Sequence, residues 1–263
     1  MDLGLKDKVI MVAAASKGLG YGIAEACAQE GASVSIGSRT EADILAAAHT
    51  LQSETGSQVL GCVMDATNNQ SILDWVQTTL SHFGGVDGLV VNAGGPPVGG
   101  FDDFDDEAWQ TAFELTLLSS VRMIRAVLPS LRTRGRGSVL TVTSSSVKEP
   151  IDILLLSNVM RSGVTSLVKS LSRQMANEGI RFNNLVPGRM DTDRVRSLDH
   201  SGAKFHNRSV AEQKALMEAQ IPWGRYGSIQ EFGQAGAFLL SEAASYITGE
   251  TLIVDGGAMR TVW

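Results

Sequence analysis

Short apolar stretches alternate with longer segments of helical periodicity along this chain. The apolar stretches lack the polar alternation of half-exposed strands, which is typical of parallel strands buried on both faces. We predict strands at residues 9–12, 33–36, 59–64, 89–91, 138–142, 180–186 and 251–254. Apolar residues at helical spacing predict helices at residues 23–28, 42–51, 72–83, 107–128 (ending near Pro129), 155–177 and 232–240.

This alternation predicts the α/β class, as a three-layer, doubly wound Rossmann fold with a seven-stranded parallel sheet. The length of 263 residues fits a single domain, 1–263. Residues 189–223 break the rhythm, because they are polar and contain no strand. They follow the sixth strand at the edge where open α/β sheets bind ligands. We interpret them as a lid over a substrate; the alternative is a flexible surface insertion.

A glycine turn follows the first strand. Gly18, Leu19 and Gly20 lie between that strand and the first helix, which is the context that a dinucleotide-binding turn requires. The free N–H groups and partial positive charge of a helix N-terminus attract a pyrophosphate. The glycine pattern alone also occurs in turns that bind nothing, so its position carries the prediction.

Composition and charge narrow the classes of function. A net charge of −6 argues against a general nucleic-acid binder. The four histidines are scattered without ligand spacing, so we expect no metal site. Cys27 and Cys62 are expected to be buried apolar residues in a reducing compartment. With no leader and no apolar run of about 18 residues, we expect a cytoplasmic protein without a membrane partner.

Several motifs occur together at the ends of the predicted strands. They are the glycine loop 13–20, Asp65 after the third strand, Asn92-Ala93-Gly94 after the fourth, Pro187-Gly188 with Thr192 after the sixth, and residues 246–249 and 255–257 around the last. With these motifs the chain resembles the short-chain dehydrogenase/reductase family over essentially its full length. Within that family it is similar to a divergent 3-oxoacyl-acyl-carrier-protein reductase-like subgroup.

The resemblance implies a nucleotide site and an assembly. The expected cofactor-binding residues are Ala14, Ser16, Lys17, Gly18, Leu19, Gly20, Arg39, Asp65, Ala66, Asn92, Ala93, Gly94, Arg161, Pro187, Gly188 and Thr192. The family also implies a homotetramer with residues 107–128 and 155–177 at the interface, and a dimer remains open.

The family's catalytic Asn-Ser-Tyr-Lys tetrad is altered here. Ser144 fits the serine position, but the asparagine, tyrosine and lysine positions hold Thr116, Ser157 and Arg161. In addition, Ala14 replaces the first loop glycine, which places a methyl group where the backbone approaches phosphate. Only the serine of the tetrad is therefore retained.

Four residues are candidates for the remaining chemistry. Ser157 and Arg161 are one helical turn apart and share a face; Arg161 keeps a positive charge but does not give up its proton. The Ser144 hydroxyl, after the fifth strand, could bind a carbonyl oxygen, and a desolvated Lys148 could donate a proton. The alternatives are a loop-capping Ser144 and a solvated Lys148 paired with Glu149.

The residues at the end of the second predicted strand distinguish binding of NADP(H) from binding of NAD(H). This strand runs into Ser38-Arg39-Thr40 with no acid before Glu41, and Lys17 adds a cation in the glycine loop. An arginine at this place accommodates the 2′-phosphate of NADP, whereas proteins that bind NAD have an acidic residue here that bonds the ribose 2′-hydroxyl. We therefore predict NADP(H) over NAD(H), with two ordinary surface cations as the alternative.

The combined prediction is an NADP-dependent oxidoreductase that reduces a small-molecule carbonyl or oxidises a secondary alcohol. The resemblance implies a reaction like that of a 3-oxoacyl reductase. The alternative is a non-redox protein, either a binding module or another class of enzyme, that reuses the nucleotide pocket. The cofactor motifs favour the first and the altered tetrad favours the second. Region 189–223 also carries four cations that would suit an anionic substrate, although we interpret them as solvated. They are Arg189, Arg194, Arg196 and Lys204.

Overall fold

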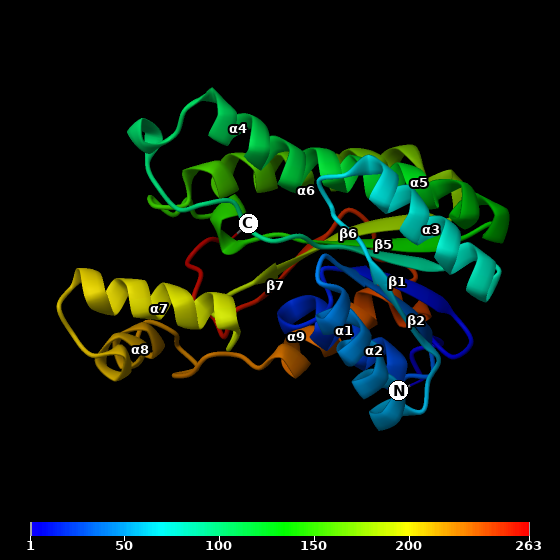
Figure 1. Cartoon of the computed structure of the whole chain (residues 1–263), viewed down its shortest axis with the longest axis horizontal. Helices are drawn as coiled ribbons and strands as arrows, with labels where there is room; N and C mark the ends of the chain where they lie inside the picture. Colours follow the sequence, from blue (N-terminus) through cyan, green and yellow to red (C-terminus); the bar gives the residue numbers. More distant parts are fainter. Residues whose placement is uncertain (1, 263) are drawn as a thin grey trace.

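A seven-stranded parallel sheet forms the centre of the computed structural model, which describes residues 2–262 (Figure 1). Its strand order is β3-β2-β1-β4-β5-β6-β7. The strands are β1 Val9–Ala13, β2 Ser33–Ser38, β3 Val59–Val63, β4 Gly88–Val91, β5 Gly137–Val142, β6 Ile180–Pro187 and β7 Thr251–Val254. On β1, Met11 pairs with Ser35 on one side and Leu89 on the other. The predicted fold class is thereby confirmed.

Helices cover both faces of the sheet (Figure 1). One layer contains α1 Gly18–Gln29, α2 Glu41–Thr55 and α9 Ile229–Leu240; the other contains α3 Asn69–Phe83, α4 Asp106–Ala112, α5 Ser119–Arg134 and α6 Leu155–Gln174. Each layer buries its own apolar cluster against the sheet, around Ile23 and Phe232 on one face and Trp75 and Phe182 on the other. Within residues 2–262, no helix combines the length and apolar character of a membrane span.

The helix predicted at 107–128 is wrong in its continuity and in its end. A π-helical segment, Phe113–Leu118, separates α4 from α5, and α5 continues through Pro129 to Arg134. Pro129 and Arg125, whose carbonyl loses its N–H partner at the proline, both lie on the exposed side of α5. Burial of Leu131 then favours continuation of the helix.

Residues 189–223 form two helices, α7 Asp193–Phe205 and α8 Val210–Glu218, which project from one end of the sheet (Figure 1). Their base is held by the buried Asp199 carboxylate, which accepts hydrogen bonds from Arg189 Nη1 and the Tyr226 hydroxyl, both at 2.8 Å. Burial, together with the hydrogen bond to Asp199, raises the pKa of Tyr226 to about 12. This tyrosine is thus part of the packing of the projecting helices.

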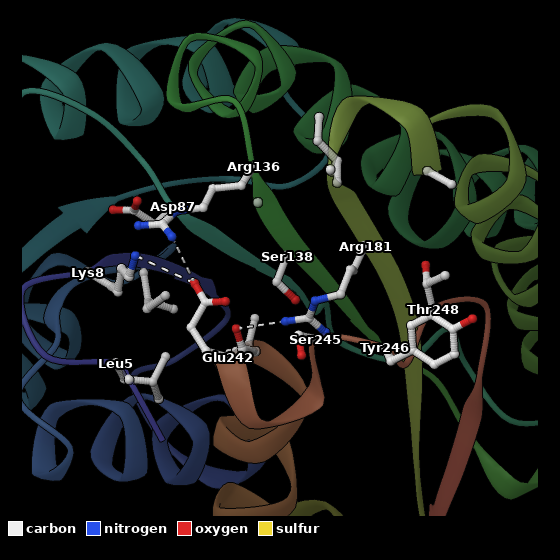
Figure 2. Close-up of a pocket in the computed structure, with 17 residues that line it drawn as sticks. Leu5, Lys8, Asp87, Arg136, Ser138, Arg181, Glu242, Ser245, Tyr246 and Thr248 are labelled. Atoms are coloured by element: carbon white, nitrogen blue, oxygen red, sulfur yellow. Dashed lines mark hydrogen bonds and ion pairs between the residues drawn. The ribbon is translucent and has the colours of Figure 1, made fainter. Parts of the chain in front are cut away.

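A cavity of about 560 Å³ lies at the opposite edge of the sheet, where the strands begin (Figure 2). Its charged groups are engaged with protein atoms. Glu242 lies 3.7 Å from Lys8 and 3.4 Å from Arg136. Arg181 donates to the carbonyls of Leu239, Leu240, Ser241 and Ile247. The guanidinium therefore satisfies carbonyls that the end of α9 leaves without helical partners.

Replacing Arg181 by alanine should destabilise the fold without touching the predicted cofactor site. Several half-buried carbonyls would lose their donor, which should lower the free energy of unfolding by about 2–3 kcal/mol. Urea unfolding measures this change. Arg136→Ala, which removes an exposed cation from the same cavity, is the matched control and should cost no more than about 1 kcal/mol. Equal costs for both variants would contradict the structural role of Arg181.

Candidate functional site

The residues predicted for the cofactor and the chemistry gather at the carboxyl edge of the sheet. Most of them lie after one of the strands β1 to β6, and Ser157 and Arg161 lie on α6. The glycine loop follows β1, Arg39 follows β2, Asp65 and Ala66 follow β3, Asn92 to Gly94 follow β4, Ser144 follows β5, and Pro187 and Gly188 lie at the end of β6. Parallel strands place these segments side by side, since all of the strands point the same way.

The glycine loop is shaped for a group that approaches the start of α1. Ala14 adopts a φ of 50°, in the left-handed region, and its carbonyl accepts a hydrogen bond from Asn92 Nδ2 at 3.3 Å. A methyl group on Gly20 would lie 2.5 Å from the Ala14 oxygen. No side chain caps α1, which begins after Lys17. Its first N–H groups thus fit the phosphate of a dinucleotide.

Lys17 and Arg39, the two cations predicted near the 2′ position of the cofactor's ribose, differ in their surroundings. Lys17 Nζ lies 2.8 Å from Asp193 Oδ2 at the start of α7, and this hydrogen bond raises the pKa of the lysine. Arg39 is exposed, and within residues 2–262 no ion pair or side-chain hydrogen bond engages it. The buried Ser38 Oγ beside it also has no partner there. Arg39 is the freer of the two cations for a phosphate.

The remaining cofactor-side residues have defined structural contacts. Asp65 Oδ1 accepts from the backbone and side chain of Thr67, at 2.9 and 2.8 Å. A methyl group on Gly188 would lie 2.5 Å from Asp255 Cβ, so the residues that follow β6 and β7 can approach this closely only with glycine. Thr192 caps α7, and a methyl group on Gly18 would lie 3.8 Å from its Cγ2. The glycine loop and the start of α7 are therefore neighbours.

The other predicted cofactor residues differ in burial. Ser16 is half-buried, while Leu19 packs onto the core and Ala66 is buried.

Ser157 and Arg161 form the predicted pair on α6. Arg161 Nε donates to Ser157 Oγ at 3.1 Å, and Arg161 Nη1 donates to the carbonyl of Val142, the last residue of β5, at 3.0 Å. Burial and the neighbouring Arg194 lower the pKa of Arg161 to about 10, so it remains charged at neutral pH. Because Ser157 Oγ accepts from a cation, its own O–H proton is free for another acceptor.

The remaining tetrad positions, and the candidate Lys148, make fewer hydrogen bonds with other residues. Ser144 Oγ accepts from the backbone N–H of Ser146 at 3.2 Å, so Ser144 does cap a short turn, with its own O–H proton left over. Thr116 lies in the π-helical segment, and its buried Oγ1 has no partner among the described residues. Lys148 is half-buried and unpaired within that same part of the chain; Glu149 instead accepts from the backbone N–H of Arg260. The proposed Lys148–Glu149 ion pair is absent there.

Two features of the site have no local signal in the sequence. Asp193, which binds Lys17, is 176 residues away from it. Arg194 reaches Gly95 from α7, where Arg161 also arrives from α6. The sequence shows Arg194 only as one of several cations. No cluster of three metal-binding side chains occurs in residues 2–262.

The chain is similar to oxidoreductases along its length. A profile of the family described as enoyl-(acyl carrier protein) reductase matches residues 13–259. A 3-oxoacyl-acyl-carrier-protein reductase from Vibrio cholerae is 34% identical over 97% of this chain and 98% of its own length.

Two solved structures share the fold and a similar degree of identity. L-sorbose reductase from Gluconobacter frateurii, complexed with NADPH and L-sorbose, has a TM-score of 0.95 at 29% identity and covers 100% of both chains. An NADPH-bound short-chain oxidoreductase from Pseudomonas aeruginosa PAO1, which contains an atypical catalytic center, has a TM-score of 0.90 at 28% identity. That match covers 98% of this chain and 99% of the other.

Proposed function

The chain belongs to the short-chain dehydrogenase/reductase family, and we propose that it reduces a small carbonyl compound with NADPH, or oxidises the alcohol with NADP, through Ser157 and Arg161. The observation that carries this proposal is the hydrogen bond from Arg161 to Ser157, at the strand edge that also holds the uncapped start of α1. Similarity to oxidoreductases over the whole chain favours redox chemistry over a non-redox binding module.

The cofactor would be held by groups from several strand ends. The start of α1 and the glycine loop would hold its phosphates, Arg39 its 2′-phosphate, and Asp65 its adenine side. Asn92 to Gly94, Gly188 and Thr192 would hold the nicotinamide side. When bound, NADPH supplies the hydride. The placement of the residues and the family support these roles. We further propose that α7 and α8 form a lid over the substrate.

Ser157 would bind the substrate oxygen and donate a proton to it as the carbonyl becomes an alcohol. The charge of Arg161 favours the deprotonated hydroxyl that remains, because an opposite charge stabilises an anion. Ser144 would orient the same oxygen with its free O–H proton, and Lys148 would return a proton from solvent. By resemblance to the family, the protein would form a homotetramer in the cytoplasm through residues 107–128, which run from α4 into α5, and residues 155–177 around α6.

Titration of the purified protein with NADPH and with NADH, followed by nicotinamide fluorescence, tests the cofactor side of this proposal. We expect NADPH to bind about 10- to 100-fold more tightly, because a charge-assisted contact to the 2′-phosphate contributes about 1.5–3 kcal/mol. Consumption of NADPH in the presence of neutral ketones and 3-oxoacyl thioesters then tests the reaction. Binding of neither nucleotide would reject the redox proposal in favour of a reused pocket.

A further inference from the structure

Two arginines from different helices converge on one exposed glycine beside the reacting pair. A methyl group placed on Gly95 would lie 3.6 Å from Arg194 Nη2 and 4.0 Å from Arg161 Nη2. Gly95 has no side chain to fill this space, and it is exposed to solvent. Arg194 lies close enough to lower the pKa of Arg161 by charge repulsion, after the larger effect of burial. Both guanidinium groups therefore lie beside the same solvent-exposed space at Gly95, which forms the opening of the candidate site.

Neither cation is neutralised by the carboxylates of this region. Asp191 and Asp193 pair with Arg196, Asp193 also pairs with Lys17, and Asp199 pairs with Arg189. Within residues 2–262, no carboxylate lies within ion-pair distance of Arg161 or Arg194. Two unneutralised like charges repel, and an anion placed between them would relieve that repulsion. Arginine also matches the geometry of a carboxylate.

The contacts of Arg161 place this opening next to the reacting oxygen. Its Nε holds Ser157 and its Nη1 holds the Val142 carbonyl, which leaves Nη2 as the nitrogen on the side of Gly95. One guanidinium thus binds the proposed proton donor at one end and faces the opening at the other. An anionic group bound there would lie only a few atoms from a carbonyl held by Ser157.

We propose that Arg161 and Arg194 bind the carboxylate of a short oxo acid, whose ketone then lies at Ser157. This inference rests on the proposed function and narrows its substrate class. Arg194 is the second residue of α7, and the Lys17–Asp193 ion pair at 2.8 Å ties the start of that helix to the glycine loop. The anion site is therefore completed by the same helix that we propose as a lid.

The test uses pyruvate, acetoacetate and levulinate, which place the ketone one, two and three bonds along the chain from the carboxyl carbon, together with their neutral methyl esters. Calorimetric titration onto the NADP-saturated protein measures binding without turnover, since the oxidised cofactor cannot reduce a ketone. We expect at least one acid to bind more tightly than its ester. Arg194→Gln should weaken the binding of that acid about tenfold, the effect of losing about 1.4 kcal/mol of charge-assisted contact. The affinity for the ester should not change.

Lys204→Gln is the matched control, because it removes one exposed positive charge from the last turn of the same helix. It should leave both affinities unchanged. The inference is wrong if no acid binds better than its ester, or if Arg194→Gln weakens acid and ester equally. A loss of NADP affinity in Arg194→Gln would also overturn it, and would assign the arginines to a cofactor phosphate. The proposed function fails separately, through absence of NADPH binding in the unaltered protein.

Discussion

Replacing Ser157 by alanine should lower kcat for carbonyl reduction by about 10²- to 10⁴-fold, the usual effect of losing a positioned general acid. In the unaltered protein Arg161 donates to Ser157 Oγ at 3.1 Å, which orients the hydroxyl and leaves its proton free. Alanine removes that proton donor and leaves the guanidinium charge in place. Steady-state kinetics with NADPH and a reducible ketone measure the loss.

Two controls separate the chemistry from a change in structure. The affinity for NADPH, measured by fluorescence, should stay within about twofold in Ser157→Ala, because the proposed role of the hydroxyl lies with the substrate. Ser162→Ala changes an exposed hydroxyl on the same helix, whose one hydrogen bond among the described residues goes to the Asn158 carbonyl. This variant should leave kcat unaltered. An unaltered kcat in Ser157→Ala would move the proton donor to Ser144 or Lys148.

Replacing Arg39 by alanine should weaken NADPH binding by about 10- to 100-fold and leave NADH binding nearly unaltered. Arg39 is exposed at the end of β2 and has no ion-pair partner within residues 2–262, so its charge is available to a 2′-phosphate. A charge-assisted hydrogen bond of about 1.5–3 kcal/mol corresponds to this range. Parallel fluorescence titrations with the two nucleotides give the two dissociation constants.

Arg39→Lys is the informative comparison, because it keeps the charge and loses the planar fork. Its NADPH affinity should lie between those of the unaltered protein and Arg39→Ala. The loss in Arg39→Ala, which removes the charge, should shrink as salt screens the contact. A variant that loses NADPH and NADH affinity to the same extent would show that Arg39 supports the loop and does not read the phosphate.

The sheet follows from the sequence because its strands are buried on both faces and carry continuous apolar runs. Val9 to Val12 are such a run, and β1 is indeed central and fully buried. The spacing of Ser157 and Arg161 also predicted their shared face. The continuation of α5 through Pro129 could not be predicted from local rules, since it depends on an exposed Arg125 and a buried Leu131.

Long-range contacts explain the rest of what the sequence did not reveal. The pairing of Lys17 with Asp193 joins two segments that only the sheet topology brings together. The same is true of Arg194, which the sequence presents as one more surface cation but which approaches Arg161 beside Gly95. Local spacing can identify partners one helical turn apart, whereas the environment of a charge depends on the whole fold.

The three directions in which Arg161 reaches bear on how this site could have diverged. A lysine there has one nitrogen and could not hold Ser157 and the Val142 carbonyl while also facing Gly95. Ser157 is only 7% exposed, so the larger side chain of a tyrosine at this position would have to displace its neighbours. A single lysine at position 161, or a single tyrosine at position 157, therefore disturbs the contacts of the present pair. The two residues form an epistatic unit, because a path between the present pair and the family's usual pair either changes both positions together or passes through one of these disturbed single replacements.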